Sequence, residues 1–113
     1  MLIKKANQQN VAKFERLQEG EGIFNLATVI ESADKTVGFH YNIMAKDASI
    51  GKHYHSEETE YYYIIRGEAE YDDNGTMCTL RAGDIAACKG GEYHAVRAIS
   101  DEFIFVGIIS IHR

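Results

Sequence analysis

Short apolar segments, either alternating with polar residues or continuous, cover most of this chain and are separated by turns that often contain glycine. From residue 22 onward these segments are rich in β-branched and aromatic residues, which favour strands over helices. Between two of them, Asn74-Gly75 predicts a tight hairpin turn, because both residues tolerate positive φ. Short strands with regular turns are typical of a sandwich or barrel, so the predicted fold class is all-β. The expected strands are 23–30, 36–44, 49–55, 60–66, 67–71, 77–81, 84–88, 94–99 and 103–111.

The first twenty residues show a weaker pattern. We expect a strand at 2–4 and then a polar stretch. Val11, Phe14 and Leu17 have the spacing of one face of a short helix. No linker, repeat or low-complexity tract divides the chain, so we predict a single domain over 1–113 with residues 1–20 as an N-terminal arm.

The last expected strand is apolar on both faces. Phe103 and Phe105 begin one face, whereas Ile104 and Val106 begin the other. A strand that is apolar on both faces is usually buried on both, although one face of a small barrel normally meets water. We therefore predict a homodimer in which two copies pack sheet against sheet.

Composition narrows the possible partners. The chain has 113 residues, 12 basic and 17 acidic, for a net charge of −5, so neither nucleic acid nor an anionic membrane is an expected partner. Apolar runs such as 103–109 are too short to span a bilayer. No apolar segment follows the N-terminal Met1, which favours a cytoplasmic protein, and Cys78 and Cys88 are expected to be reduced core residues.

Three histidines and one glutamate form the most informative pattern. His53 and His55 are two residues apart, so on a strand their side chains point to the same face. Glu60 follows on the next expected strand, and His94 lies beyond the glycine-containing hairpin. Three neutral imidazoles and one carboxylate are suitable ligands for one divalent transition metal ion. The sequence therefore predicts a metal site made by these four residues.

The same residues resemble the cupin family. The first cupin motif has His-x-His, three or four residues, Glu, six residues and Gly, which match His53, His55, Glu60 and Gly67. The motif normally opens with a glycine six residues before the first histidine, where this chain has Asp47. The resemblance implies a jelly-roll barrel, also called a double-stranded β-helix, and extends over about residues 36–110.

The second cupin motif is matched less completely. Gly83, Gly91 and His94 are in register with it, whereas Lys89 replaces a proline and Ala98 replaces an asparagine. These departures fall outside the ligand positions, so they bear on turn geometry rather than on the metal site. Within the family, the sequence around the first motif resembles that of the short single-domain members likened to oxalate decarboxylase.

The donor set does not identify the ion. Imidazole with carboxylate suits Fe(II), Mn(II), Ni(II), Zn(II), Co(II) or Cu(II). Four protein ligands leave two positions open on an octahedral ion, where a substrate would bind. Glu57 and Glu58 are rival carboxylates, and Glu58 is the second choice because it shares strand parity with Glu60 but lies closer to the turn.

Residues in phase with the expected ligands are candidates for substrate contact. Tyr62 lies two residues after Glu60, which makes it the candidate catalytic residue, with barrel filling as the alternative role. His40 and Asn42 share one face of strand 36–44, but parity does not tell which face lines the barrel. We expect His40 at the surface or in a dimer interface rather than as a fifth ligand.

Two functions fit these residues. One is a metal-dependent enzyme that acts on a small polar metabolite, and the resemblance implies a dioxygenase, decarboxylase or isomerase type of reaction. The alternative is a non-catalytic, ligand-binding or sensing cupin with a structural metal. Oxalate decarboxylation itself is disfavoured, because Ile50 stands where the decarboxylase pattern has an arginine that binds the substrate carboxylate.

Overall fold

The structure is a computed structural model that describes residues 5, 10–15, 18, 20–31 and 36–112. Within these residues the chain forms ten strands and no helix long and apolar enough to cross a bilayer. The strands are β1 Asn10–Glu15, β2 Ile23–Glu31, β3 Val37–Ala45, β4 Ser49–Tyr54, β5 Glu58–Arg66, β6 Glu68–Asp73, β7 Thr76–Arg81, β8 Ile85–Cys88, β9 Tyr93–Ala98 and β10 Glu102–Ile111.

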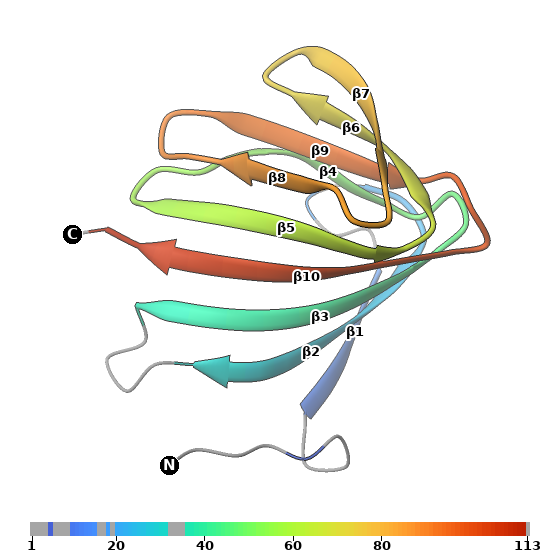
Figure 1. Cartoon of the computed structure of the whole chain (residues 1–113), viewed down its shortest axis with the longest axis horizontal. Helices are drawn as coiled ribbons and strands as arrows, with labels where there is room; N and C mark the ends of the chain where they lie inside the picture. The colour runs from blue at the N-terminus through green and yellow to red at the C-terminus, as the bar shows by residue number, and fades with distance from the viewer. Residues whose placement is uncertain (1–4, 6–9, 16–17, 19, 32–35, 113) are drawn as a thin grey trace.

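The strands form two antiparallel sheets that face each other (Figure 1). The larger sheet has the order β1-β2-β3-β10-β5-β8, and the smaller sheet has the order β4-β9-β6-β7. Several pairs of strands that are consecutive in sequence, such as β3 and β4 or β8 and β9, therefore belong to different sheets. This arrangement confirms the all-β, jelly-roll fold class, and every strand predicted from residue 23 onward is present.

The N-terminal segment differs from the prediction. Residues 10–15 form strand β1, which pairs antiparallel with β2, so the short helix expected around Val11 and Phe14 is wrong. The reason is that pairing with β2 gives the backbone of 10–15 hydrogen-bond partners along a sheet edge, and this long-range gain outweighs the local apolar spacing. The strand expected at 2–4 and Leu17 lie outside the described residues.

Two turns adopt left-handed backbone conformations. Asn74 and Gly75 have φ values of 51° and 93°, which confirms the predicted tight turn of the β6–β7 hairpin. Asp47 has a φ of 67°, and its N–H donates a 2.9 Å hydrogen bond to the Ala98 carbonyl. Aspartate enters the left-handed region more readily than most residues. Asp47 therefore keeps a glycine-like conformation at the position where the cupin motif has glycine.

The register of β3 decides which of its faces lines the interior. Asn42 pairs with Phe105 and Met44 pairs with Phe103, and all four are buried between the sheets. The side chains at positions 40, 42 and 44 therefore face inward, and those at 39, 41 and 43 face outward. His40 is thus an inward-facing residue, which corrects the expectation that it lies at the surface or in a dimer interface.

The two cysteines are both free thiols, as expected. Cys88 is buried at the end of β8, whereas Cys78 on β7 is exposed. Only Cys88 is therefore a core residue, and the expectation that Cys78 is one is wrong.

Candidate metal centre

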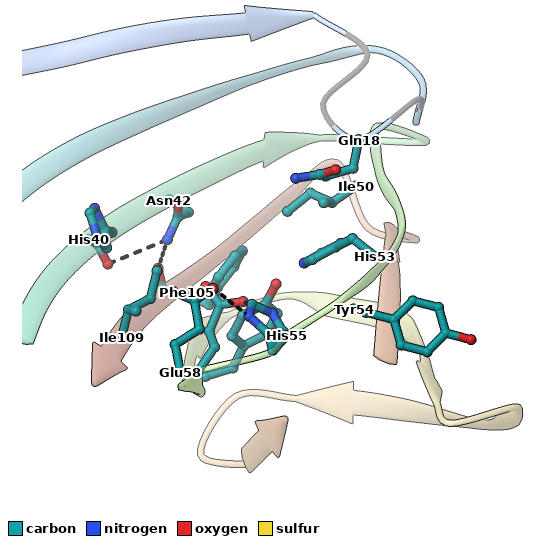
Figure 2. A pocket seen from close by; sticks show the side chains of 12 residues that line it. Gln18, His40, Asn42, Ile50, His53, Tyr54, His55, Glu58, Phe105 and Ile109 are labelled. Carbon is teal, nitrogen blue, oxygen red and sulfur yellow. Dashed lines mark hydrogen bonds and ion pairs between the residues drawn. The ribbon is translucent and has the colours of Figure 1, made fainter. Parts of the chain in front are cut away.

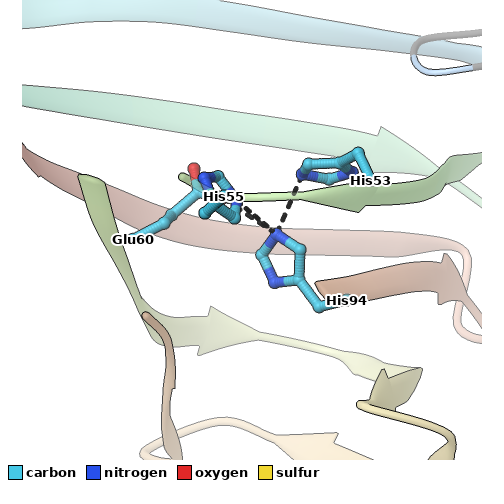
Figure 3. Close-up of side chains that lie close together, drawn as sticks. All are labelled: His53, His55, Glu60 and His94. Carbon is cyan, nitrogen blue, oxygen red and sulfur yellow. Dashed lines mark hydrogen bonds and ion pairs between the residues drawn. The ribbon is translucent and has the colours of Figure 1, made fainter. Parts of the chain in front are cut away.

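His53, His55, Glu60 and His94 come together between the two sheets (Figure 3). His53 lies on β4 directly opposite His94 on β9, and His55 follows at the end of β4. Glu60 comes from β5 in the other sheet. One donor atom from each residue lies within 4.8 Å of the other three. The jelly-roll connections therefore bring together side chains that are far apart in the sequence.

The donor atoms are spaced as ligands of one ion. His94 Nε2 lies 2.9 Å from His53 Nε2, 3.0 Å from His55 Nε2 and 3.1 Å from Glu60 Oε1. His55 Nε2 lies 3.3 Å from Glu60 Oε1. Two donors that each lie about 2.1 Å from an ion and occupy neighbouring octahedral positions are separated by about 3 Å. These four atoms therefore have the spacing of neighbouring ligands.

The other ring nitrogens of His53 and His55 are held by acceptors. His53 Nδ1 lies 2.8 Å from the Gly51 carbonyl, and His55 Nδ1 lies 2.7 Å from Glu58 Oε1. A carbonyl and a carboxylate accept hydrogen bonds, so both rings donate from Nδ1. In a neutral ring the lone pair is then on Nε2, which is the atom that points to the centre. Glu58, the rival carboxylate, is thus not in the cluster but fixes the orientation of His55.

His94 has a different partner. Its Nδ1 lies 2.7 Å from the hydroxyl of Tyr71, and the His94 side chain is 1% exposed. This contact fixes the plane of the ring and directs His94 Nε2 toward His53 and His55. Sequence reasoning missed Tyr71, since its position on a neighbouring hairpin gives no spacing signal that links it to His94.

These four donor atoms need a positive charge between them. Three imidazole lone pairs and a carboxylate oxygen that face one another inside a barrel would repel, and burying them without compensation is costly. A divalent transition metal ion removes that cost and matches the donor types. The residues present therefore fit one such ion, and the predicted cluster of His53, His55, Glu60 and His94 could hold it.

The electrostatics of the cluster favour an ionised Glu60. Burial opposes ionisation of this carboxyl more than any other single influence, yet its close contacts with the His55 and His94 rings lower its pKa to about 2. The hydrogen bond to Glu60 is also the main reason that the pKa of His55 is raised, while burial lowers the pKa of His53. The field that favours a proton on His55 next to Glu60 also favours a metal cation between them.

The donor cluster opens into a pocket of about 260 Å³ (Figure 2). Ile50, Phe105 and Ile109 provide apolar walls, and Ile50 lies at the position where the decarboxylase pattern has arginine. His40 and Asn42 on β3 also line the pocket. The described lining residues are Gln18, His40, Asn42, Ile50, His53, Tyr54, His55, Glu58, Glu60, Tyr62, Phe105 and Ile109.

Tyr62 lies beside the cluster and also packs in the core. Its ring stacks on Phe105 with centroids 4.1 Å apart, and it lies 5.3 Å from the His94 ring. The residue is 2% exposed and lines the pocket. Burial raises the pKa of the Tyr62 hydroxyl well above its usual value, so the phenol keeps its proton. The position is compatible with both roles considered for it, barrel filling and contact with a substrate.

Comparisons with known proteins agree with this geometry. The family profile described as "Cupin domain" matches residues 39–110. A Thermotoga maritima protein named "Oxalate-binding protein" is 25% identical over 96% of this chain and 94% of its own length. A crystal structure of a predicted oxalate decarboxylase from the same organism has a TM-score of 0.91 at 23% identity, covering 97% of this chain and 99% of that one. The structure of KdgF from Halomonas sp. has a TM-score of 0.74 at 17% identity, covering 80% of both chains.

Proposed function

Because this chain belongs to the cupin family, we propose that it is a metal-dependent enzyme that acts on a small polar metabolite. One divalent transition metal ion, Fe, Mn, Ni, Zn, Co or Cu, is held by His53, His55, Glu60 and His94. The observation that carries the proposal is the convergence of four metal-ligating atoms at spacings of 2.9–3.3 Å, three of them imidazole Nε2 atoms. A cluster that opens into a pocket favours a catalytic site over a closed structural one.

The chain's own residues prepare the site for a ligand. Glu58 and Tyr71 hold two of the histidine rings through Nδ1, so their Nε2 atoms keep a fixed direction. Ile50 and Phe105 contribute apolar surface to the pocket. The bound ion would supply Lewis-acid polarisation of a substrate oxygen. Tyr62 is the proposed catalytic residue, since its protonated hydroxyl can donate a hydrogen bond to a substrate beside His94.

A second function is favoured by one comparison. The Thermotoga maritima relative is named for binding oxalate, not for a reaction. A non-catalytic cupin that holds a small carboxylate, with the metal as part of the binding site, would use the same four ligands. The two functions differ in whether the bound molecule is changed, so only turnover distinguishes them.

The test is metal analysis of protein prepared without a histidine tag, followed by turnover assays with the metal that is found. We expect about one transition metal ion per chain, an exchangeable water on that ion, and turnover of a small carboxylate or dicarbonyl compound. A four-coordinate zinc without an exchangeable water, and no turnover across the panel, would favour the binding function. Protein that takes up no transition metal would contradict both.

The outer face of the larger sheet supports the proposed homodimer. Phe39, Ile108 and Tyr61 lie side by side across β3, β10 and β5, and the next row includes Tyr63 and Ile85. Ile85 is 69% exposed, and Phe39, Tyr61 and Tyr63 are also exposed. A contiguous band of exposed aromatic and aliphatic side chains is typical of a protein interface.

We expect light scattering to give the mass of two chains at micromolar concentration, because packing two such bands together removes apolar surface from water. Tyr63→Glu and Ile85→Glu together should convert the dimer to a monomer, whereas Met77→Glu on the other sheet should not. Wild-type protein that is monomeric at that concentration would contradict the proposal. The single domain, the cytoplasmic location and the lack of nucleic-acid or membrane partners stay predictions.

A further inference from the structure

β10 contains a glycine whose missing side chain leaves a gap beside the metal centre. Gly107 pairs with Tyr62 on β5 and with His40 on β3, so it lies between two inward-facing side chains. Its φ is not in the left-handed region, so the backbone conformation does not require glycine. Glycine inside a strand weakens the strand and often marks a place where a ligand approaches closely.

The atoms around this gap belong to the metal centre and to β3. A Cβ at position 107 would lie 3.4 Å from Asn42 Nδ2, 3.7 Å from Phe105 Cε2 and 3.8 Å from Glu60 Oε2. The Asn42 amide and the Glu60 carboxylate therefore flank the same small space. All three distances are ordinary van der Waals contacts, so alanine would fit at position 107 and a larger side chain would fill the gap.

Two inward-facing polar side chains on β3 are weakly bonded or lack a partner within the described part of the chain. Asn42 is 3% exposed, and among the described residues its amide nitrogen makes two long hydrogen bonds, of 3.4 Å each, to the His40 and Phe105 carbonyls. His40 Nδ1 is buried and has no hydrogen-bond partner within the part of the chain that the structure describes. Figure 2 shows both residues on the other side of the pocket from His55 and Glu58. Buried polar groups without good partners usually have a ligand or water as partner.

The charge of the pocket restricts that ligand. Glu58 and Glu60 both line it, and its described lining residues include no lysine or arginine. A divalent ion can balance the charge of one ligand carboxylate. A second ligand carboxylate would meet the neutral carboxamide of Asn42 and the carboxylates of Glu58 and Glu60. Such an uncompensated charge in a partly buried pocket is unfavourable.

We propose that Asn42 and His40 form a second binding subsite, here the β3 subsite, for an uncharged hydroxyl or carbonyl group of a short monocarboxylate whose acid end lies at the metal centre. Gly107 leaves room for the ligand between the two ends. The proposal rests on the proposed metal site and adds the substrate class: hydroxy or keto monocarboxylates rather than dicarboxylates. Asn42 acts by hydrogen bonding, and His40 provides the second polar contact.

Three probes with the same α-hydroxy acid end test the subsite. Lactate ends in a methyl group, glycerate in a hydroxymethyl group and tartronate in a second carboxylate. The protein is first saturated with the metal found on purification and then titrated calorimetrically at pH 8. We expect glycerate to bind about fivefold to tenfold more tightly than lactate, which is the difference in affinity that one net hydrogen bond provides. Tartronate should bind more weakly than glycerate.

Variants assign the effect to the subsite. Asn42→Leu should bind glycerate and lactate equally, and Gly107→Val should weaken both probes more than Gly107→Ala does, because the alanine methyl already takes up part of the space between Asn42 and Glu60. All three should retain about one metal ion per chain. Valine favours strands, so Gly107→Val stays informative if Asn42→Leu folds poorly.

Each outcome decides the inference. If glycerate and lactate bind equally to the wild type, if the preference survives in Asn42→Leu, or if tartronate binds most tightly, the β3 subsite is overturned while the metal site stands. If the wild-type protein takes up no metal, the proposed function fails and this inference fails with it.

Discussion

Replacing His94 with alanine is expected to remove stoichiometric metal from the protein while the barrel stays folded, and His53→Ala is expected to do the same. His94 Nε2 is the atom nearest to the other three donors, with separations of 2.9–3.1 Å. Loss of an outer partner of a ligand typically weakens metal binding about 10- to 100-fold, so loss of a ligand itself should weaken it more. Elemental analysis of dialysed protein measures the loss, and circular dichroism verifies the fold.

A matched control comes from the same residue type. His112 lies outside the cluster, where its Nε2 is 3.2 Å from the Thr59 hydroxyl, so His112→Ala should keep about one ion per chain. If the His53→Ala and His94→Ala variants both retain about one ion per chain, the ligand assignment is wrong. If His112→Ala loses the ion as well, general destabilisation rather than ligand loss is the cause.

The common direction of His53 and His55 was predictable because it depends on local spacing. His53 and His55 share a face through the two-residue period of a strand, and this holds without knowledge of the rest of the fold. The Asn74-Gly75 turn was predictable for a similar reason, since its positive φ values are a local property. The residue types of Glu60 and His94 made them candidates and the family resemblance supported them, but their approach in space depends on how the two sheets face each other.

What was missed depends on long-range pairing. Strand parity groups His40 with Asn42, but only the pairing of β3 with β10 shows that this face lies inside the barrel. Strand parity also could not distinguish Glu58 from Glu60 as the carboxylate ligand. In the structure, Glu60 lies in the cluster beside His55 Nε2, whereas Glu58 contacts His55 Nδ1. The helix expected near Val11 and Phe14 failed for the same reason, since β2 provides partners that no local pattern reveals.

The three histidines are fixed by chemically different partners. Gly51 contributes a backbone carbonyl, Glu58 a carboxylate and Tyr71 a hydroxyl. The backbone contact is built into β4, so it forms with the strand, whereas the Glu58 and Tyr71 contacts need β5 and β6 to be in place. The geometry of the cluster therefore depends on the folded barrel, and metal binding should in turn stabilise the barrel.

Removing the metal is accordingly expected to lower the thermal stability of the protein by a large amount. The Glu60 carboxylate and the facing nitrogens of His55 and His94 lie close together. Without the ion, only protons can offset the repulsion between these groups, and they do so less completely than a divalent cation. A ligand that binds only the folded state at about 100 times its dissociation constant contributes about 2.7 kcal/mol. For a domain of this size, each kcal/mol corresponds to a shift in Tm of about 4–8 °C, so a loss of about 10–20 °C is expected.

The measurement is a pair of thermal melts, before and after treatment with a chelator, followed by re-addition of the metal. Re-addition should restore the Tm, whereas Mg(II), which prefers oxygen ligands, should not. The His94→Ala variant provides the matched control: it lacks a donor at the centre of the cluster, so neither chelator nor metal should shift its Tm. Equal melting temperatures for metal-loaded and metal-free wild-type protein would contradict the idea that a cation compensates the charges gathered between the two sheets. A shift of equal size in His94→Ala would show that the stabilising ion binds elsewhere.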